Sequence, residues 1–455
     1  MEEKRKQKIE ALYKKYSKQE EESIIEETFY KHKNHVFIIV SDSGKPFFSR
    51  YGDVMSMCTT LAAFHSAAEA ISDEGNLPSM INNATNNNYN SMNTDMKEKE
   101  INIEIESDEK RILFENRWPF MFVSFNGNND TYDQIKQLHK FIQHTIYVHV
   151  PLAIFKECLA ERQAADIRQC ITDNVIDIKI AMHFWSTWIG AQTEKVEWVT
   201  YPLQDKVHEI ITTKVNKTNQ MINNDIVMCV VHKGKKLMHC VSNRALKISP
   251  NDINGMICYS LLYDGEGDVG LPEFSESGKL KVFSQTIGIF KIILMYQNQT
   301  SLNAVKECVE SITNEFNLLY TKTITYFNAP TIPDLYTQHL LFYYVLFGDD
   351  YVVSGPMREL FTERKQRKRI KTLCSKLYWE NENMKKMNEP KVTNGIKCSS
   401  FQTDMETIAT KQTNKGLLIC VFNFIVDIPT SIDYINVIDR WLNNYDVEFK
   451  YKYFN

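Results

Sequence analysis

The stretch HVFIIVSDSGKPFFSRYG, residues 35–52, decides the fold at the beginning of this 455-residue chain. A β-branched apolar run is followed by Gly44-Lys45 and then by a second apolar run. A Gly-Lys pair after a strand also ends a nucleotide-binding phosphate loop, which needs glycine five residues earlier and a hydroxyl residue after the lysine. Here Ile39 and Pro46 occupy those positions, and a strand follows where a phosphate loop needs a helix. The stretch therefore predicts a β-hairpin with Gly44 in its turn, and no nucleotide site.

This hairpin begins a pattern of elements that the chain repeats. The order is two strands joined by a glycine turn, a helix, further strands and a closing helix. It occurs in residues 34–150, 223–328 and 334–455. Strands are predicted from short β-branched and aromatic runs, and helices from apolar residues at every third or fourth position. The sequence therefore predicts an α/β (α+β) chain of three longin-type domains, each a five-stranded antiparallel sheet flanked by helices.

Capping residues mark two of the helix starts. Asp130 or Thr131 precedes the closing helix of the first domain, and Ser249-Pro250 begins the first helix of the second. A short polar side chain accepts hydrogen bonds from the first N–H groups of a helix, and proline suits the first helical position. We therefore expect the first of these helices to begin directly after Asp130 or Thr131, and the second directly after Ser249.

Three further segments precede, interrupt or connect these domains. Residues 1–33 are charged and predict a helix or arm that is either solvated or weakly bound to a membrane surface or a partner. Residues 76–100 are rich in asparagine and predict a disordered insertion. Residues 151–222 predict a helical connector, whose aromatic cluster at 184–188 either packs between domains or forms an exposed partner surface.

The composition limits the classes of partner. The net charge is −4, so nothing global favours nucleic acid, which needs a basic surface. The 10 cysteines are scattered without a Cys-x-x-Cys pair, which favours reduced thiols over a disulfide scaffold. The charged N-terminus lacks the apolar core of a signal peptide, and the longest apolar runs are about half as long as a membrane span. We therefore expect a cytoplasmic protein that binds no nucleic acid.

Recognisable enzyme motifs are missing from the sequence. DGEGD at 264–268 gathers three carboxylates but lacks the other ligands of a calcium loop, so we expect a flexible loop there. The histidines do not have the spacing of a four-ligand zinc site, and no Gly-x-Ser-x-Gly, His-Glu-x-x-His or Cys/His nucleophile pattern occurs. We predict no catalytic residue, no metal site and no cofactor.

The densest positive charge in the chain is RKQRKRIK at 364–371. The run fits the solvated face of a helix, a localisation signal, or a contact with an anionic lipid surface. At such a surface each Lys or Arg contributes about 1 kcal/mol, and about three or four of six cations on a helix can face the same way. That is enough for recruitment but not for stable anchoring. The candidate lipid-binding residues are Arg364, Lys365, Arg367, Lys368, Arg369 and Lys371.

The first hairpin resembles the opening of the SAND/Mon family of vesicle-fusion proteins, where similar residues (SEAGKPIYSRYG-like) lie between a strand and a long helix. Further similarities follow in order: Arg117 and Pro119 before an apolar strand, LPEFSESG at 271–278, and IPDL at 332–335. The asparagine-rich insertion departs from the family pattern. The matching hairpin residues are Gly44, Lys45, Pro46, Ser49, Arg50, Tyr51 and Gly52.

The resemblance implies a subunit of the heterodimeric Mon–Ccz guanine-nucleotide exchange factor for the Rab GTPase of late endosomes and vacuoles, which acts in trafficking, fusion and autophagy. In that family the partner is a Ccz-type longin subunit, and the paired first domains bind the Rab. Exchange works by binding the nucleotide-free Rab more tightly than the loaded form, so the subunit needs no active-site chemistry of its own. A non-catalytic longin-type trafficking adaptor is the alternative.

The resemblance also implies where the partners bind. Peripheral recruitment to late-endosomal or vacuolar membranes would use a phosphoinositide surface, for which the basic run at 364–371 is the candidate. The Rab would lie near the helix expected at 53–71 and the adjoining hairpin. The candidate Rab- or partner-binding residues are Lys45, Pro46, Ser49, Arg50, Tyr51 and Gly52.

Overall fold

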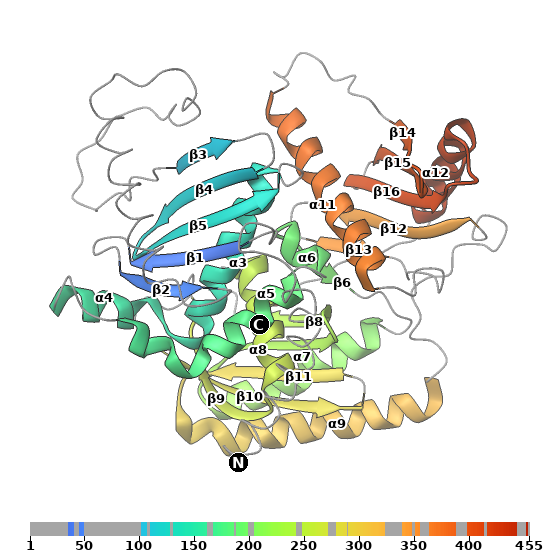
Figure 1. The fold of residues 1–455 in the computed structure, drawn as a ribbon. Helices are drawn as coiled ribbons and strands as arrows, with labels where there is room; N and C mark the ends of the chain where they lie inside the picture. Colours follow the sequence, from blue (N-terminus) through green and yellow to red (C-terminus); the bar gives the residue numbers. More distant parts are fainter. Residues whose placement is uncertain are drawn as a thin grey trace. The chain divides into compact units, whose positions relative to one another are not determined.

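The computed structural model divides the chain into two compact units, Met1–Met182 and His183–Asn455 (Figure 1). The residues that the structure describes are 35–40, 45–49, 102–106, 110–127, 131–161, 167–185, 188–198, 204–242, 248–271, 279–288, 290–323, 339–347, 351–354, 364–387, 398–413, 416–443 and 452–453. The expected N-terminal arm, the helix at 53–71 and the asparagine-rich insertion lie outside these residues.

The first unit is built on a five-stranded antiparallel sheet with the strand order β2-β1-β5-β4-β3. The central strand β5 is buried from Phe120 to Ser124, and Phe37 of β1 lies opposite Val123 of β5. A continuous apolar run of this kind suits a strand that is covered on both faces. The strands are β1 (His35–Val40), β2 (Pro46–Ser49), β3 (Asn102–Glu106), β4 (Lys110–Arg117) and β5 (Phe120–Gly127).

The helical segments of this unit are α3 (Tyr132–His149), α4 (Leu152–Glu161), η2 (Ile167–Asn174) and α5 (Val175–Trp185), which runs on into the second unit. Helix α3 begins directly after Thr131, which is one of the two caps that the sequence allowed. The hydroxyl oxygen of Thr131 accepts from the N–H of Gln134 at 3.3 Å, and Oε1 of Gln134 accepts from the N–H of Thr131 at 3.1 Å. These two bonds form a reciprocal capping box. Phe155 of α4 packs edge-on against Phe120 of β5, with ring centroids 5.2 Å apart.

The described strands of the second unit form one 12-stranded sheet. Its order is β14-β15-β16-β12-β13-β6-β8-β7-β11-β10-β9, and β17 pairs with β8. The strands are β6 (Val196–Trp198), β7 (Ile226–Lys233), β8 (Lys236–Ser242), β9 (Gly265–Val269), β10 (Leu280–Ile287), β11 (Phe290–Tyr296), β12 (Leu340–Phe347), β13 (Tyr351–Ser354), β14 (Cys398–Gln402), β15 (Glu406–Thr413), β16 (Gly416–Asn423) and β17 (Lys452–Tyr453). The helices are α6 (Ile189–Gln192), α7 (Gln204–Met221), α8 (Pro250–Leu262), η3 (Gln299–Ser301), α9 (Leu302–Thr323), α11 (Arg364–Met387) and α12 (Ile428–Asn443).

Three sets of five strands share one strand order. When the five strands of a set are numbered in chain order, their order across the sheet is 2-1-5-4-3. This holds for β2-β1-β5-β4-β3, for β8-β7-β11-β10-β9 and for β13-β12-β16-β15-β14. Every pairing within a set is antiparallel. A helix follows the fifth strand of each set, namely α3, α9 and α12. The mixed α/β fold is confirmed, but the second and third sets run into one sheet instead of the separate sheets that we expected.

The short strand β6 joins these two sets. Its residues pair in parallel with β13, where Val196 lies opposite Tyr351, and with β8, where Trp198 lies opposite Leu237. All three residues of β6 are buried. The sequence did not predict this strand, because three residues are too few to show a period.

Residues 188–198, which we call the clasp, contact a helix of the second set and a helix of the third set. The carbonyl oxygen of Gln192 accepts from the hydroxyl of Ser375 at 3.3 Å and from the indole N–H of Trp379 at 3.0 Å, both on α11. On the other side, the side-chain amide of Asn254 in α8 donates to the carbonyl of Lys195 at 2.9 Å. The aromatic cluster at 184–188 is buried, with Trp188 0% exposed. It therefore packs inside the protein and does not form an exposed surface.

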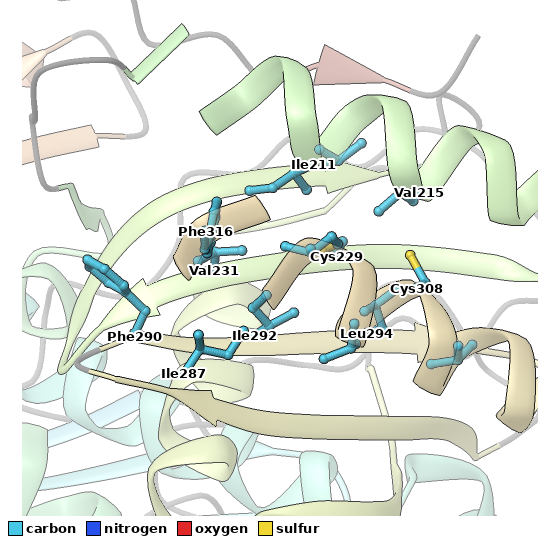
Figure 2. Close-up of a cluster of buried hydrophobic side chains, with 14 of the residues drawn as sticks. Ile211, Val215, Cys229, Val231, Ile287, Phe290, Ile292, Leu294, Cys308 and Phe316 are labelled. Atoms are coloured by element: carbon cyan, nitrogen blue, oxygen red, sulfur yellow. The ribbon is translucent and has the colours of Figure 1, made fainter. Parts of the chain in front are cut away.

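The core of the second set lies between the sheet and the helices α7 and α9 (Figure 2). Alternate residues of β7 and β11 point into it, and the helices contribute Ile211 and Phe316. Fully burying one such apolar side chain contributes about 1.5–3 kcal/mol to stability. Helix α8 on the same set begins at Ser249-Pro250, as predicted, with Asp252 completing a capping box.

Two details differ from the sequence prediction. Strand β14 does not show the pattern of a strand in the sequence, because CSSFQ has only one large apolar residue. The segment at 264–268, expected as a flexible loop, contains the edge strand β9.

Candidate functional site

The predicted partner-binding residues lie on an edge strand, as far as they are described. Pro46 and Ser49 belong to β2, at one edge of the five-stranded sheet, and Lys45 directly precedes it. Arg50, Tyr51 and Gly52 lie outside the described residues. The outer edge of β2 pairs with none of the described strands.

Aromatic contacts hold this edge strand on the unit. Phe47 and Phe48 of β2 are buried. The ring centroid of Phe47 lies 4.6 Å from that of Phe120 and 5.9 Å from that of Phe155. The β1–β2 register shifts between Ile38 and Ile39, which is a bulge near the turn. The strand thus presents a fixed edge, because its aromatic side chains anchor it to β5 and α4.

Arg117, which the family resemblance singled out, belongs to a buried charge network. Its Nη2 lies 2.6 Å from Oε1 of Glu115, and the other carboxylate oxygen lies 2.7 Å from Nδ1 of His139. Burial by itself raises the pKa of Glu115, but the hydrogen bond with His139 and the charge of Arg117 outweigh it, so the pKa falls to about 2. Burial lowers the pKa of His139, which therefore donates its Nδ1–H as a neutral ring. The network fixes β4 against α3 and is structural in character.

The basic run at 364–371 forms the first two turns of α11. Arg369 makes a two-pronged ion pair with the buried carboxylate of Glu406 on β15, with Nη1 2.7 Å from Oε1. The next residue, Ile370, is fully buried, while Lys368 is exposed. The side chains of Arg364, Lys365 and Arg367 lie outside the description, and Lys371 is partly buried. The structure thus places one of the six candidate cations, Arg369, in an ion pair within the protein.

The acidic segment at 264–268 is neutralised by lysines. Asp264, Glu266 and Asp268 each pair with a different lysine, at 2.9, 2.5 and 2.6 Å respectively. These lysines come from β10, β11 and α9, far along the sequence, which is why the sequence could not reveal them. These paired charges lie along the edge of the sheet, where charged side chains discourage pairing with a strand of another chain.

One pair of side chains has the residue types of a nucleophile and its base. Nε2 of His232 lies 2.7 Å from Oγ of Ser260, and its Nδ1 lies 2.7 Å from the carbonyl oxygen of Gly234. Burial lowers the pKa of His232 to about 4, so the ring is neutral and donates through Nδ1 to Gly234. Both side chains are buried, so a substrate cannot reach them.

The buried thiols are also unsuited to chemistry. Burial raises the pKa of Cys240 and of Cys374 to about 12, and raises that of Cys229 and Cys420 as well. Thiols with raised pKa values are poor nucleophiles at neutral pH because little thiolate is present. The nine cysteines in the described part of the chain are reduced.

Neither a metal site nor a membrane span occurs in the part of the chain that the structure describes. Among these residues, no three His, Cys, Asp or Glu side chains come together in a way that could hold a metal ion. None of the described helices is both long and apolar enough to cross a bilayer.

Glu115 and His139 were missed by the reasoning from sequence. A carboxylate inside the apolar run of β4 was a usable signal, since a buried charge needs a partner. The partner itself lies 24 residues away on α3, so the sequence alone could not name it.

Comparison with known proteins finds a distant relative. No protein-family model matches the sequence. Vacuolar fusion protein MON1 homolog A of Gallus gallus is 22% identical to the chain over 274 residues. The aligned region covers 58% of this chain and 43% of the relative, so the chain spans less than half of the relative's length. The chain is thus distantly similar, over part of its length, to a vacuolar fusion protein.

Proposed function

We propose that this chain is a subunit of a heterodimeric guanine-nucleotide exchange factor of the SAND/Mon type, acting on a Rab GTPase in late-endosomal and vacuolar trafficking and fusion. The observation that carries the proposal is the 2-1-5-4-3 strand order, which occurs three times with a closing helix after each set. We assign each set as a longin domain. The partial similarity to a vacuolar fusion protein supports the same proposal.

An exchange factor of this kind acts by differential binding. It stabilises the nucleotide-free GTPase relative to the loaded form, so nucleotide leaves faster and no bond in the protein is made or broken. The chain then needs a shaped surface and a partner subunit. The edge strand β2, with Lys45, Pro46 and Ser49, is our candidate for part of that surface in the first unit.

We infer that the basic run recruits the protein to an anionic membrane, and the structure sharpens the test. Arg369 is bound by Glu406, so Arg369→Ala should lower thermal stability. Lys368 is exposed, so Lys368→Glu combined with Arg367→Glu should weaken binding to phosphoinositide vesicles. If the double variant binds vesicles as well as the wild type, the basic run is a solvated helix face and not a membrane contact.

The subunit claim is tested by isolating the chain from its own cells at endogenous level. The proposal predicts one stoichiometric partner with a longin-type fold, identified by mass spectrometry. The alternative, a non-catalytic adaptor, also has partners but does not accelerate nucleotide release. Recovery of the chain as a monomer or a homo-oligomer alone would contradict both the heterodimer and the adaptor built on it.

A further inference from the structure

Four large apolar side chains are exposed together at one end of the third strand set. They come from two turns, 402–406 between β14 and β15 and 423–428 between β16 and α12. The turns lie side by side, because Glu406 pairs with Asn423 across the sheet and the side-chain amide of Gln402 donates to the carbonyl of Phe424 at 2.6 Å. We call this cluster the apolar tip; its members are Met405, Phe424, Ile425 and Ile428, which are 53%, 55%, 67% and 40% exposed.

Both turns are held in place by hydrogen bonds. The hydroxyl oxygen of Thr403 accepts from the N–H groups of Met405 and Glu406, at 3.2 and 3.0 Å. In the second turn, the hydroxyl of Thr407 donates to the carbonyl of Val426 at 2.5 Å, and the Val426 side chain is buried. The apolar tip is therefore presented by a fixed backbone, and a partner that covers it has little loop entropy to overcome.

The rim of the apolar tip is acidic. Asp404 and Asp427 are exposed at its border, and neither turn contains a lysine or arginine. The carboxylate of Asp427 accepts from the N–H of Thr430 at 2.8 Å, which holds its charge at the start of α12. The third carboxylate, Glu406, is buried and already bound by Arg369. The exposed negative charge that the two turns offer to a partner is therefore that of Asp404 and Asp427.

We propose that the apolar tip is a docking site for a protein segment that carries apolar side chains flanked by lysine or arginine. Apolar surface that is exposed on a fixed backbone marks interaction sites, and complementary charge at the rim selects the partner. An anionic membrane is the less suitable occupant, because the carboxylates of Asp404 and Asp427 would repel it. The site lies apart from β2 in the sequence, and the basic run reaches it through Arg369, which binds Glu406. The apolar side chains of the tip therefore add to the proposed function a contact of a different kind from that of the basic run.

The first part of the test identifies what covers the tip. Phe424→p-benzoylphenylalanine is introduced into the full chain in cells, and the photo-crosslinked product is identified by mass spectrometry. The captured protein is then purified and its affinity for the unmodified chain is measured. Crosslinks only to lipid, only within the chain or only to a second copy of it would overturn the proposal.

The second part asks whether the tip and its rim provide the affinity. Ile425→Asp should weaken binding of the purified partner at least about tenfold, as for a central interface residue. Asp404→Lys combined with Asp427→Ser, which keeps a capping side chain on α12, should weaken it by about three- to tenfold and reduce its salt dependence. Matched controls are Met221→Asp on α7 and Met384→Asp on α11, which are 68% and 54% exposed and should leave binding unchanged.

Two results would contradict this part. One is an affinity that neither tip variant changes, while both variants unfold at the wild-type temperature. The other is a loss of binding to phosphatidylserine-containing vesicles caused by Ile425→Asp, which would assign the tip to a membrane. If the heterodimer forms and exchanges nucleotide while the tip variants bind normally, the docking proposal fails and the proposed function stands.

Discussion

Gly190 in the clasp offers a direct test of how the second and third strand sets are joined. A Cβ at this position would lie 2.8 Å from the carbonyl oxygen of Lys195 and 2.9 Å from the backbone nitrogen of Glu197. Both neighbours are backbone atoms, so Gly190→Ala can be accommodated only if β6 shifts. Because β6 is buried and paired with β8 and β13, we expect the full cost of overpacking, about 1–3 kcal/mol.

The assay is thermal unfolding, followed by amide hydrogen exchange. A cost of this size should lower Tm by about 2–12 °C for a unit of this length. Protection should fall first in β6 and the adjoining strands β8 and β13. Gly234→Asn is the matched control, since Gly234 has a φ of +55°, a Cβ there would meet no atom within 4 Å, and asparagine tolerates that backbone. A Tm for Gly190→Ala that equals that of the control would refute this account of the clasp.

Three further substitutions test the local structure. Glu115→Gln removes the carboxylate charge that Arg117 and His139 bind, and it should lower the free energy of unfolding by about 3 kcal/mol at neutral pH. The pKa of Glu115 is about 2 in the folded protein against 4.5 for the ordinary group, so the stability of the wild type should fall as the pH drops from 4.5 towards 2. Urea unfolding of the variant should lack this part of the pH dependence. Ser249→Ala should cost about 1 kcal/mol through loss of the α8 cap, whereas Ser249→Asn should be nearly neutral in the same urea titration. Gly267→Ala places a Cβ 2.1 Å from the hydroxyl oxygen of Tyr259 and should lower Tm, with partial recovery in the double variant with Tyr259→Phe; an equal loss in both would show that the clash lies elsewhere.

Much of the local structure could be predicted, because local signals determine it. Thr131 and Ser249 begin helices through side-chain caps that are visible in the sequence. Gly234 lies in the hairpin turn at positive φ, as a glycine between two apolar runs predicts. The first two strands, the last two strands and the closing helix of each set follow in the same way from hydrophobic period, whereas the third strands β9 and β14 do not.

What could not be predicted depends on contacts between distant residues. β6 is three residues long, and it is a strand because β8 and β13 pair with it on either side. The carboxylates at 264–268 suggested a loop, but three lysines from other elements neutralise them in an edge strand. In the sequence, Arg369 is one of six similar cations, and only the fold shows that Glu406 binds it. All six candidate Rab-binding residues stay predictions, and three of them, Arg50, Tyr51 and Gly52, fall outside the described residues.

Nucleotide release from the GTPase tests the proposed function most directly. The chain is co-purified with its longin-type partner, and the complex is added to the late-endosomal Rab loaded with a fluorescent guanine nucleotide, with excess unlabelled nucleotide present. The account predicts that the release rate rises in proportion to the concentration of the heterodimer, and that neither subunit alone has this effect. A well-formed heterodimer that binds the Rab but leaves its release rate at the spontaneous value would contradict the account and favour the adaptor.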